Sequence, residues 1–186
     1  TTHRIGADMF NGLHRWFGSL PGGFAIGSTV VCAIFGFMSG SNTAAAATVG
    51  SVAIPAMEAK KYYRPLSLGT LAVAGTLAAL IPPSTIMILY GSAATNVSIG
   101  RVFVGGIIPG ILLTFLMSLY IYFYALAYPA RAPRGDKATL REKILGLKEL
   151  APAFFLFVTI IGGMYTGIFT AIEASAVSVL ATLILL

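Results

Sequence analysis

The sequence predicts an all-α membrane protein, a polytopic helical bundle with one re-entrant helical hairpin and one transmembrane helix that a double proline breaks. Three observations support this fold class. Hydrophobic residues make up 57% of the 186 residues and charged residues only 10%, whereas soluble domains are about a quarter charged. The charged residues are also segregated, with none between Phe17 and Met57. Such uncharged stretches exceed the roughly 18 apolar residues that mark a membrane span.

On this interpretation the chain has six segments. They are a polar cytoplasmic lead-in (1–20), a re-entrant hairpin (21–57), a broken transmembrane helix (66–94), a transmembrane helix (102–128), a cytoplasmic basic linker with an interfacial helix (129–150) and a further apolar segment (151–186). The chain lacks an initiator Met and stops inside an apolar run, so we expect it to be cut at both ends.

The hydrophilic linkers predict the orientation of the chain in the lipid bilayer. Residues 58–65 contain three basic residues and residues 129–150 contain six, whereas residues 95–101 contain a single Arg. Because cytoplasmic loops carry an excess of Lys and Arg, the first two linkers are expected in the cytoplasm and the third outside. The net charge of +6 therefore reflects membrane topology, and we expect no nucleic-acid partner.

The first apolar segment, 21–57, is too long for one membrane span and too short for two. Its second part, residues 44–57, would rise only about 21 Å at 1.5 Å per residue, against a hydrocarbon core of about 30 Å. A re-entrant hairpin fits this length better. Its tip is expected at Ser39-Gly40-Ser41-Asn42-Thr43, with both ends facing the cytoplasm.

The second apolar segment, 66–94, contains Pro82 and Pro83 near its centre. These prolines cannot donate hydrogen bonds to the carbonyls of Ala78 and Ala79, and each disfavours helical geometry in the preceding residue. The helix is therefore expected to break near mid-membrane depth. Unpaired backbone is tolerated there only where protein or a water-filled cavity receives it.

An interfacial helix is expected in the second basic linker, lying on the cytoplasmic leaflet. Asp136 is a suitable N-cap for it. Its apolar face would consist of Leu140, Ile144 and Leu147, and its polar face would carry Lys137, Arg141 and Lys148.

The hairpin tip offers partial charges of both signs. The first helix would end with free carbonyls at residues 37–39, and the second would begin with free N–H groups around residues 44–46. The carbonyls and the oxygens of Ser41, Asn42 and Thr43 suit a hard cation such as Na⁺, and the helix N-terminus suits a carboxylate. Helix breaks that meet near the midplane form ion and substrate sites in many secondary transporters.

Other interpretations of the same residues remain open. Gly36 with Gly40, and Gly106 with Gly110, are also typical of close helix packing, and Ser-Gly-Ser-Asn is ordinary turn chemistry. Glu173 is the one acid inside an apolar segment. An acid at such a place indicates ion coupling, or a simple helix cap if it lies at the outer interface.

Several functional classes can be weighed from the residue types. An intramembrane serine protease needs a base beside its Ser, and no His or Lys lies inside any apolar segment, so we expect no enzyme. No cofactor is expected either, apart from Na⁺ as a coupling ion. A channel lined by carbonyls, another sodium/dicarboxylate symporter of the ion-transporter superfamily, and a non-transporting membrane scaffold subunit remain alternatives.

Several short motifs occur in one order along almost the whole chain, and with them the chain resembles the large permease subunit of TRAP transporters. These motifs are Leu20-Pro21-Gly22-Gly23, Ser39-Gly40-Ser41-Asn42-Thr43-Ala44, Pro55-Ala56-Met57, Leu80-Ile81-Pro82-Pro83-Ser84, Gly106-Ile107-Ile108-Pro109-Gly110, Gly162-Gly163-Met164-Tyr165 and Glu173-Ala174. Two positions depart from the family. Asn42 stands where a second Ser or a small residue is usual, as in the Ser-Asn-Thr tips of related sodium/dicarboxylate carriers, and Ile172 replaces the common Thr.

The resemblance implies inverted repeats with two re-entrant hairpins, an elevator-type movement and sodium-coupled uptake of small organic anions, of the C4-dicarboxylate or sugar-acid class. It also implies a small membrane partner subunit, a periplasmic substrate-binding protein and a multi-pass location in the bacterial inner membrane. Residues 151–186 are then the truncated start of a second repeat, whose hairpin lies beyond the chain.

By the same resemblance, the hairpin tip and the proline break form one sodium site and half of the substrate site. A buried anion needs positive charge nearby, and in the absence of Lys and His a bound cation and a helix N-terminus must supply it. The expected sodium ligands are Ser39, Gly40, Ser41, Asn42, Thr76, Ile81 and Pro82, and the expected substrate contacts are Ser41, Asn42, Thr43 and Ser84.

Overall fold

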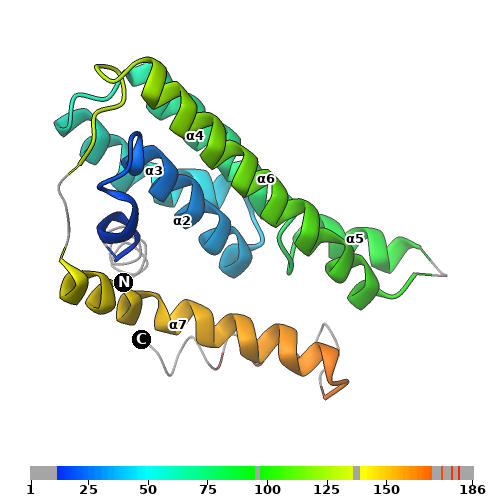
Figure 1. Ribbon diagram of the computed structural model, residues 1–186. Coiled ribbons are helices and arrows are strands. Elements are labelled where there is room, and N and C mark those ends of the chain that lie inside the picture. The colour runs from blue at the N-terminus through cyan, green and yellow to red at the C-terminus, as the bar shows by residue number, and fades with distance from the viewer. Residues whose placement is uncertain are drawn as a thin grey trace.

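The structure is a computed structural model that describes residues 12–94, 97–135 and 139–168, together with residues 173, 177 and 180. Regular structure within these ranges is helical throughout (Figure 1). The elements are α2 (Gly23–Ser39), α3 (Asn42–Ala59), α4 (Arg64–Gly75), the 3₁₀ turn η1 (Thr76–Ala79), α5 (Thr85–Ala93), α6 (Ile99–Ala127) and α7 (Leu140–Tyr165). The predicted all-helical class is confirmed.

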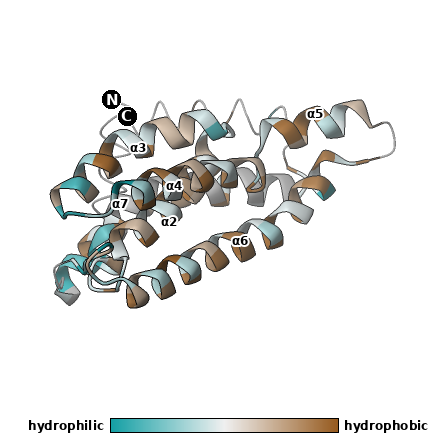
Figure 2. Cartoon of the chain, turned by 90° about the horizontal axis from the view of Figure 1, so that it is seen from above, coloured by the Kyte–Doolittle hydropathy of each residue, from teal (hydrophilic) through white to brown (hydrophobic). Residues whose placement is uncertain are grey.

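Helix α2 is the centre of the bundle, because α3, α4, η1 and α6 all pack against it. Its sequence contains no charged residue, and Ala25, Val31 and Cys32 are completely buried. A helix that is apolar on all sides is stable only where other elements surround it. Figure 2 shows that hydrophilic residues gather instead at one end of the bundle.

The segment predicted as a hairpin consists of α2 and α3. Gly40 ends α2 in the left-handed region, with φ 60°, and its N–H donates to the carbonyl of Gly36 at 2.7 Å. Glycine adopts this conformation without the steric cost of a Cβ. Extended backbone at Ser41 then starts α3. Whether the hairpin is re-entrant stays a prediction.

The segment 66–94 contains two α-helices, α4 and α5, with an interruption between them. After η1 the N–H groups of Leu80 and Ile81 both donate to the carbonyl of Leu77, each at 3.0 Å, and residues 80–84 are not helical. Helical structure resumes at Thr85, directly after the double proline and Ser84. The depth of this interruption in a membrane stays a prediction.

Helix α6 has 29 residues and is the one helix among the described residues that is long and apolar enough to cross a membrane. It extends three residues before the predicted start at Val102 and ends at Ala127. The shorter helix α2 is also apolar. Length and composition therefore agree with the transmembrane helix predicted at 102–128.

Helix α7 differs from the expectation, because one helix continues across the boundary that the sequence analysis placed between residues 150 and 151. Its N-terminus is a capping box at Thr139: the backbone N–H and the hydroxyl of Thr139 donate to the Glu142 carboxylate at 2.7 and 2.8 Å. These hydrogen bonds lower the pKa of Glu142. Asp136, the predicted cap, lies outside the described residues.

Candidate functional site

The hairpin tip lies against the interrupted helix. The carbonyl of Gly40 accepts hydrogen bonds from the Thr85 hydroxyl at 3.0 Å and from the Thr85 N–H at 3.4 Å. A Cβ at Gly40 would lie 2.9 Å from the carbonyl oxygen of Pro83. The structure thus joins the turn between α2 and α3 to the first residue of α5, which is 45 positions further along the chain.

Small residues permit two further close contacts behind this junction. A Cβ at Gly36 would lie 2.7 Å from the Cβ of Ala78, so α2 and η1 approach each other closely. A Cβ at Gly75 would lie 2.7 Å from the Cβ of Ala46. These contacts place both helices of the hairpin against the residues that precede the double proline, and they agree with the packing interpretation of Gly36.

On its other side the interrupted segment packs on α6. A Cβ at Gly110 would lie 2.8 Å from the Cγ1 atom of Ile81, and Gly106 faces Met87 and the carbonyl of Leu80. The pair Gly106 and Gly110 therefore makes room for the non-helical residues, again as the packing interpretation expects. Ordered non-helical backbone is held here between the hairpin and α6.

The hydroxyl groups of the tip bond within the tip, mainly to its backbone. The hydroxyls of Ser41 and Thr43 are 3.2 Å apart, and the Ser41 hydroxyl also accepts the N–H of Ala44 at 3.4 Å. Ser39 contacts the backbone of Ser41 at 3.4 Å. Ser41 is thus the N-cap of α3, and part of the tip is the ordinary turn chemistry that the sequence analysis left open.

The N–H groups expected to be free at residues 44–46 need a correction. The N–H of Ala44 donates to the Ser41 side chain and that of Ala45 to the Ser41 carbonyl at 3.0 Å. Because Gly40 turns the chain sharply, α3 begins at Asn42, two residues earlier than expected. By position the N–H groups of residues 41–44 lack a helical partner. Those of Ser41 and Ala44 bond side chains, which leaves those of Asn42 and Thr43.

Ser84 is the most distinctive polar residue of the interruption. It is completely buried, and its hydroxyl has no hydrogen-bond partner among the described residues. Although Ser84 occupies the N-cap position of α5, its side chain does not cap the helix. Buried hydroxyl groups are nearly always satisfied, so an unmatched one beside an opened helix is a candidate contact for a bound solute.

The other predicted residues of the interruption have defined surroundings. The Thr76 hydroxyl donates to the carbonyl of Val73 at 2.7 Å and is exposed. Pro82 is buried, and the N–H of Ile81 donates to Leu77. The sequence analysis missed Thr85, although its signal was available, since a hydroxyl residue at the start of a helix after Pro-Pro is well placed to bond a neighbouring chain.

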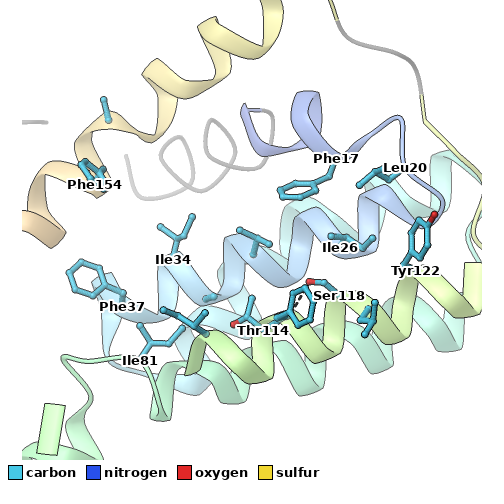
Figure 3. Close-up of a pocket in the computed structure, with 16 residues that line it drawn as sticks. Phe17, Leu20, Ile26, Ile34, Phe37, Ile81, Thr114, Ser118, Tyr122 and Phe154 are labelled. Carbon is cyan, nitrogen blue, oxygen red and sulfur yellow. Dashed lines mark hydrogen bonds between the residues drawn. The ribbon is translucent and has the colours of Figure 1, made fainter. Parts of the chain in front are cut away.

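A separate apolar cavity of about 1010 Å³ lies between α2, α6 and α7 (Figure 3). Its lining includes Ile34, Ile81 and Phe154. The hydroxyls of Thr114 and Ser118 also line it, but each donates to a carbonyl of its own helix, at 2.7 and 2.8 Å. Tyr122 adds one further hydroxyl, and no residue of this lining is charged. A buried anion would find no compensating positive charge there, so this cavity is not the candidate site for an organic acid.

Glu173, the acid predicted inside an apolar segment, belongs to the C-terminal part of the chain. Glu173 is exposed and helical, and Phe169, Thr170 and Ile172 around it lie outside the described residues. Within the part of the chain that the structure describes, no three His, Cys, Asp or Glu side chains gather as a metal site would require. Oxygen atoms of hydroxyls and carbonyls are what the tip and the interruption offer.

Comparisons of the sequence with known proteins identify its family. The whole chain, residues 1–186, matches the family described as the DctM component of the tripartite ATP-independent periplasmic transporter. It is 41% identical over 163 residues to the C4-dicarboxylate TRAP transporter large permease protein DctM of Vibrio cholerae, covering 88% of this chain and 35% of that protein.

Two other relatives are named for different solutes. The isethionate TRAP transporter permease protein DctMQ of Oleidesulfovibrio alaskensis is 35% identical over 91% of this chain and 26% of its own length. The sialic acid TRAP transporter large permease protein SiaM of Vibrio cholerae is 34% identical over 95% of this chain and 41% of its own length. The chain thus spans less than half the length of these relatives. It belongs to the DctM family of TRAP transporter permease proteins.

Proposed function

We propose that this chain forms one half of the transport site in a sodium-coupled symporter for small organic anions. The observation that carries the proposal is the junction of the hairpin tip with the interrupted helix, where Gly40 bonds Thr85. A turn between two helices and an interruption within a third segment meet there, and helix ends at such places present backbone groups of opposite sign. This is the arrangement by which broken helices hold ions and substrates in secondary transporters.

The cation would bind between the tip and the residues that precede the double proline. Candidate ligands are Ser39, Gly40, Ser41, Asn42, Thr76, Ile81 and Pro82. All offer oxygen, which favours a hard ion such as Na⁺ over a transition metal. Gly40 is the weakest candidate, because its carbonyl already accepts two hydrogen bonds from Thr85.

The anion would bind at the N-terminus of α3. There the N–H groups of Asn42 and Thr43 lack helical partners by position, and the helix dipole favours negative charge. Ser41 and the unmatched hydroxyl of Ser84 would complete the contacts. Relatives are named for C4-dicarboxylates, isethionate, sialic acid and ectoine, so this half-site recognises a carboxylate or sulfonate group and not a whole molecule.

The lengths of the hairpin helices support a re-entrant arrangement. Helix α2 has 17 residues and α3 has 18, which corresponds to about 26 and 27 Å. Both are shorter than a hydrocarbon core of about 30 Å. In this proposal the hairpin enters from the cytoplasmic side of the bacterial inner membrane, and the complete multi-pass subunit works with a small membrane subunit and a periplasmic substrate-binding protein.

Sodium dependence of uptake tests the site in the full-length, reconstituted complex. Asn42→Ala and Ser41→Ala should raise the sodium concentration for half-maximal uptake by about tenfold, since losing one ligand or charge-assisted bond costs about 1.5 kcal/mol. Ser51→Ala is the matched control, because this exposed Ser on α3 bonds only the carbonyl of Thr48. If uptake by both tip variants has the same sodium dependence as the wild type, the tip is a packing turn and not a sodium site.

Counterflow separates a carrier from the alternatives. A carrier exchanges labelled for unlabelled anion across a membrane and saturates, whereas a channel does neither and a scaffold subunit transports nothing. If the Ser84→Ala complex still assembles but shows no counterflow, this buried hydroxyl lies in the transport path. Full activity of that variant would remove Ser84 from the proposed substrate contacts.

A further inference from the structure

Two basic linkers that are far apart in the sequence lie together at one end of the bundle. The N–H of Tyr63 donates to the carbonyl of Arg131 at 2.8 Å, and the hydroxyl of Tyr62 donates to the carbonyl of Pro133 at the same distance. We call the exposed basic side chains of these linkers the basic corner. It consists of Lys60, Lys61, Arg64, Arg131 and Arg134.

The basic corner carries little compensating negative charge. Glu58 is the one acidic residue of the two linkers in the ranges 58–65 and 129–135, and it lies 3.6 Å from Arg64. Both side chains of that pair are well exposed, at 75% and 48%, so water screens their attraction. The corner therefore presents a concentrated positive surface to an anionic partner.

Arg131 is held in a fixed position within this corner. Its guanidinium group lies over the rings of Tyr63 and Tyr128, 5.0 and 4.8 Å from their centroids, and it donates to the hydroxyl of Tyr124 at 3.4 Å. Stacking occupies the faces of the guanidinium group and leaves edge N–H groups for an acceptor. A planar fork of this kind matches the oxygens of a phosphate.

The surface next to Arg131 is the outer face of α6. Tyr120, Tyr124 and Tyr128 follow one another at single-turn spacing, with ring centroids 6.2 and 5.2 Å apart. Exposed apolar side chains lie on the same helix, among these tyrosines at Phe123 and further from Arg131 at Phe115. Tyrosines between a basic cluster and an apolar helix face are typical of the level of lipid headgroups.

We propose that the basic corner binds the phosphodiester headgroup of an anionic phospholipid, whose acyl chains lie along the exposed face of α6. The proposal rests on the cytoplasmic placement of both linkers in the proposed function. A lipid fits better than a soluble anion because the positive surface continues directly into an apolar helix face of membrane-spanning length. At the opposite end of α6, Arg101 is the one basic residue of the described residues 97–101.

Native mass spectrometry of the full-length complex tests this proposal without measuring transport. The complex would be equilibrated in mixed micelles of phosphatidylglycerol and phosphatidylcholine, and the retained lipids counted. Arg131→Gln and Arg134→Gln each remove one basic residue, and each should lower phosphatidylglycerol retention about fivefold. Arg101→Gln should leave this retention unchanged. Arg134 makes no described side-chain contact that its replacement would disturb, so its variant separates charge from folding.

A second substitution tests the role of the stacked rings. Tyr63→Leu keeps every charge but removes one face of the stack, and it should also weaken retention of phosphatidylglycerol. Equal retention by wild type, Arg131→Gln and Arg134→Gln would overturn the proposal. Loss of a protein subunit from these variants with unchanged lipid retention would overturn it too, since the corner would then be a protein interface. Neither result depends on whether the tip binds sodium.

Discussion

Tyr62 connects three parts of the chain through a single buried hydroxyl group. The hydroxyl accepts the N–H of Phe24 at 3.3 Å and donates to the carbonyl of Pro133 at 2.8 Å. The N-cap residue of α2, Gly22, has no side chain for this purpose, so Tyr62 satisfies one of the N–H groups in the first turn. Burial raises the pKa of Tyr62 to about 12, against a smaller opposite effect of the Phe24 N–H.

Replacing Tyr62 by Phe should lower the free energy of unfolding by about 1–3 kcal/mol, because the buried N–H of Phe24 and the partly buried carbonyl of Pro133 lose this hydrogen bond. The midpoint of thermal unfolding of the full-length protein in detergent measures this change. Tyr120→Phe is the control, since Tyr120 is 65% exposed. An identical midpoint for Tyr62→Phe and the wild type would contradict the assigned role.

The pH dependence of stability provides a further check on the same residue. The folded state raises the pKa of Tyr62, so its contribution is fully present below the ordinary value of 10 and is lost as pH rises toward about 12. The wild type should therefore lose more stability than Tyr62→Phe between pH 10 and pH 12. Parallel stability curves of the two proteins over this window would be inconsistent with a buried, titrating phenol.

Thr85 holds the hairpin tip to the start of α5 through two hydrogen bonds to the carbonyl of Gly40. The bond from its hydroxyl is shorter than the bond from its N–H. Thr85→Val keeps the shape of the side chain and removes this donor, whereas Thr85→Ser retains it. Loss of about 0.5–1.5 kcal/mol should raise the sodium concentration for half-maximal uptake by about two- to tenfold in the Val variant only. Equal sodium dependence in both variants would show that the bond has no influence on the site.

At the scale of elements, the hairpin depends on the left-handed turn at Gly40. Gly40→Ala should destabilise the tip by about 1–2 kcal/mol through its positive φ, and its Cβ would also crowd the carbonyl of Pro83. Gly69→Ala in α4 is the control, because a Cβ there meets nothing within 4 Å and alanine favours helix. Limited proteolysis should find the tip more accessible in Gly40→Ala alone.

The positions of helix ends were predictable where a single local residue decides them. Proline lacks an N–H and Gly40 accepts a positive φ, so the interruption before Thr85 and the turn after α2 appear at the expected places. The N-terminus of α7 was less accessible to prediction. Asp136 and Thr139 are both suitable caps by residue type, and the partnership of Thr139 with Glu142 is a detail of the folded turn.

At the scale of the whole molecule, the proposed topology places both basic linkers on the cytoplasmic side and residues 96–100 on the periplasmic side. Single cysteines at Lys60 and Arg134 should react with an impermeant reagent only after the inner face is opened, whereas one at Ser98 should react from outside. Native Cys32 is completely buried and should contribute no background. Labelling at Lys60 from the outside alone would show that the topology is wrong.

The sequence by itself determined the helical class, the membrane-length helix, the turn at Gly40 and the helix interruption at the double proline. These features depend on composition and on the backbone preferences of Gly and Pro, which act over a few residues. The motifs of the sequence also resemble those of the TRAP permease family, and the match over residues 1–186 confirms that family.

Only the tertiary structure decided which of these local features meet. Residue types alone do not pair Gly40 with Thr85, bury the hydroxyl of Ser84 without a partner, or stack Arg131 between Tyr63 and Tyr128. The physical reason is that contacts between distant residues depend on how closely whole helices pack. That distance is set jointly by small residues on several elements, such as Gly36 against Ala78 and Gly110 against Ile81.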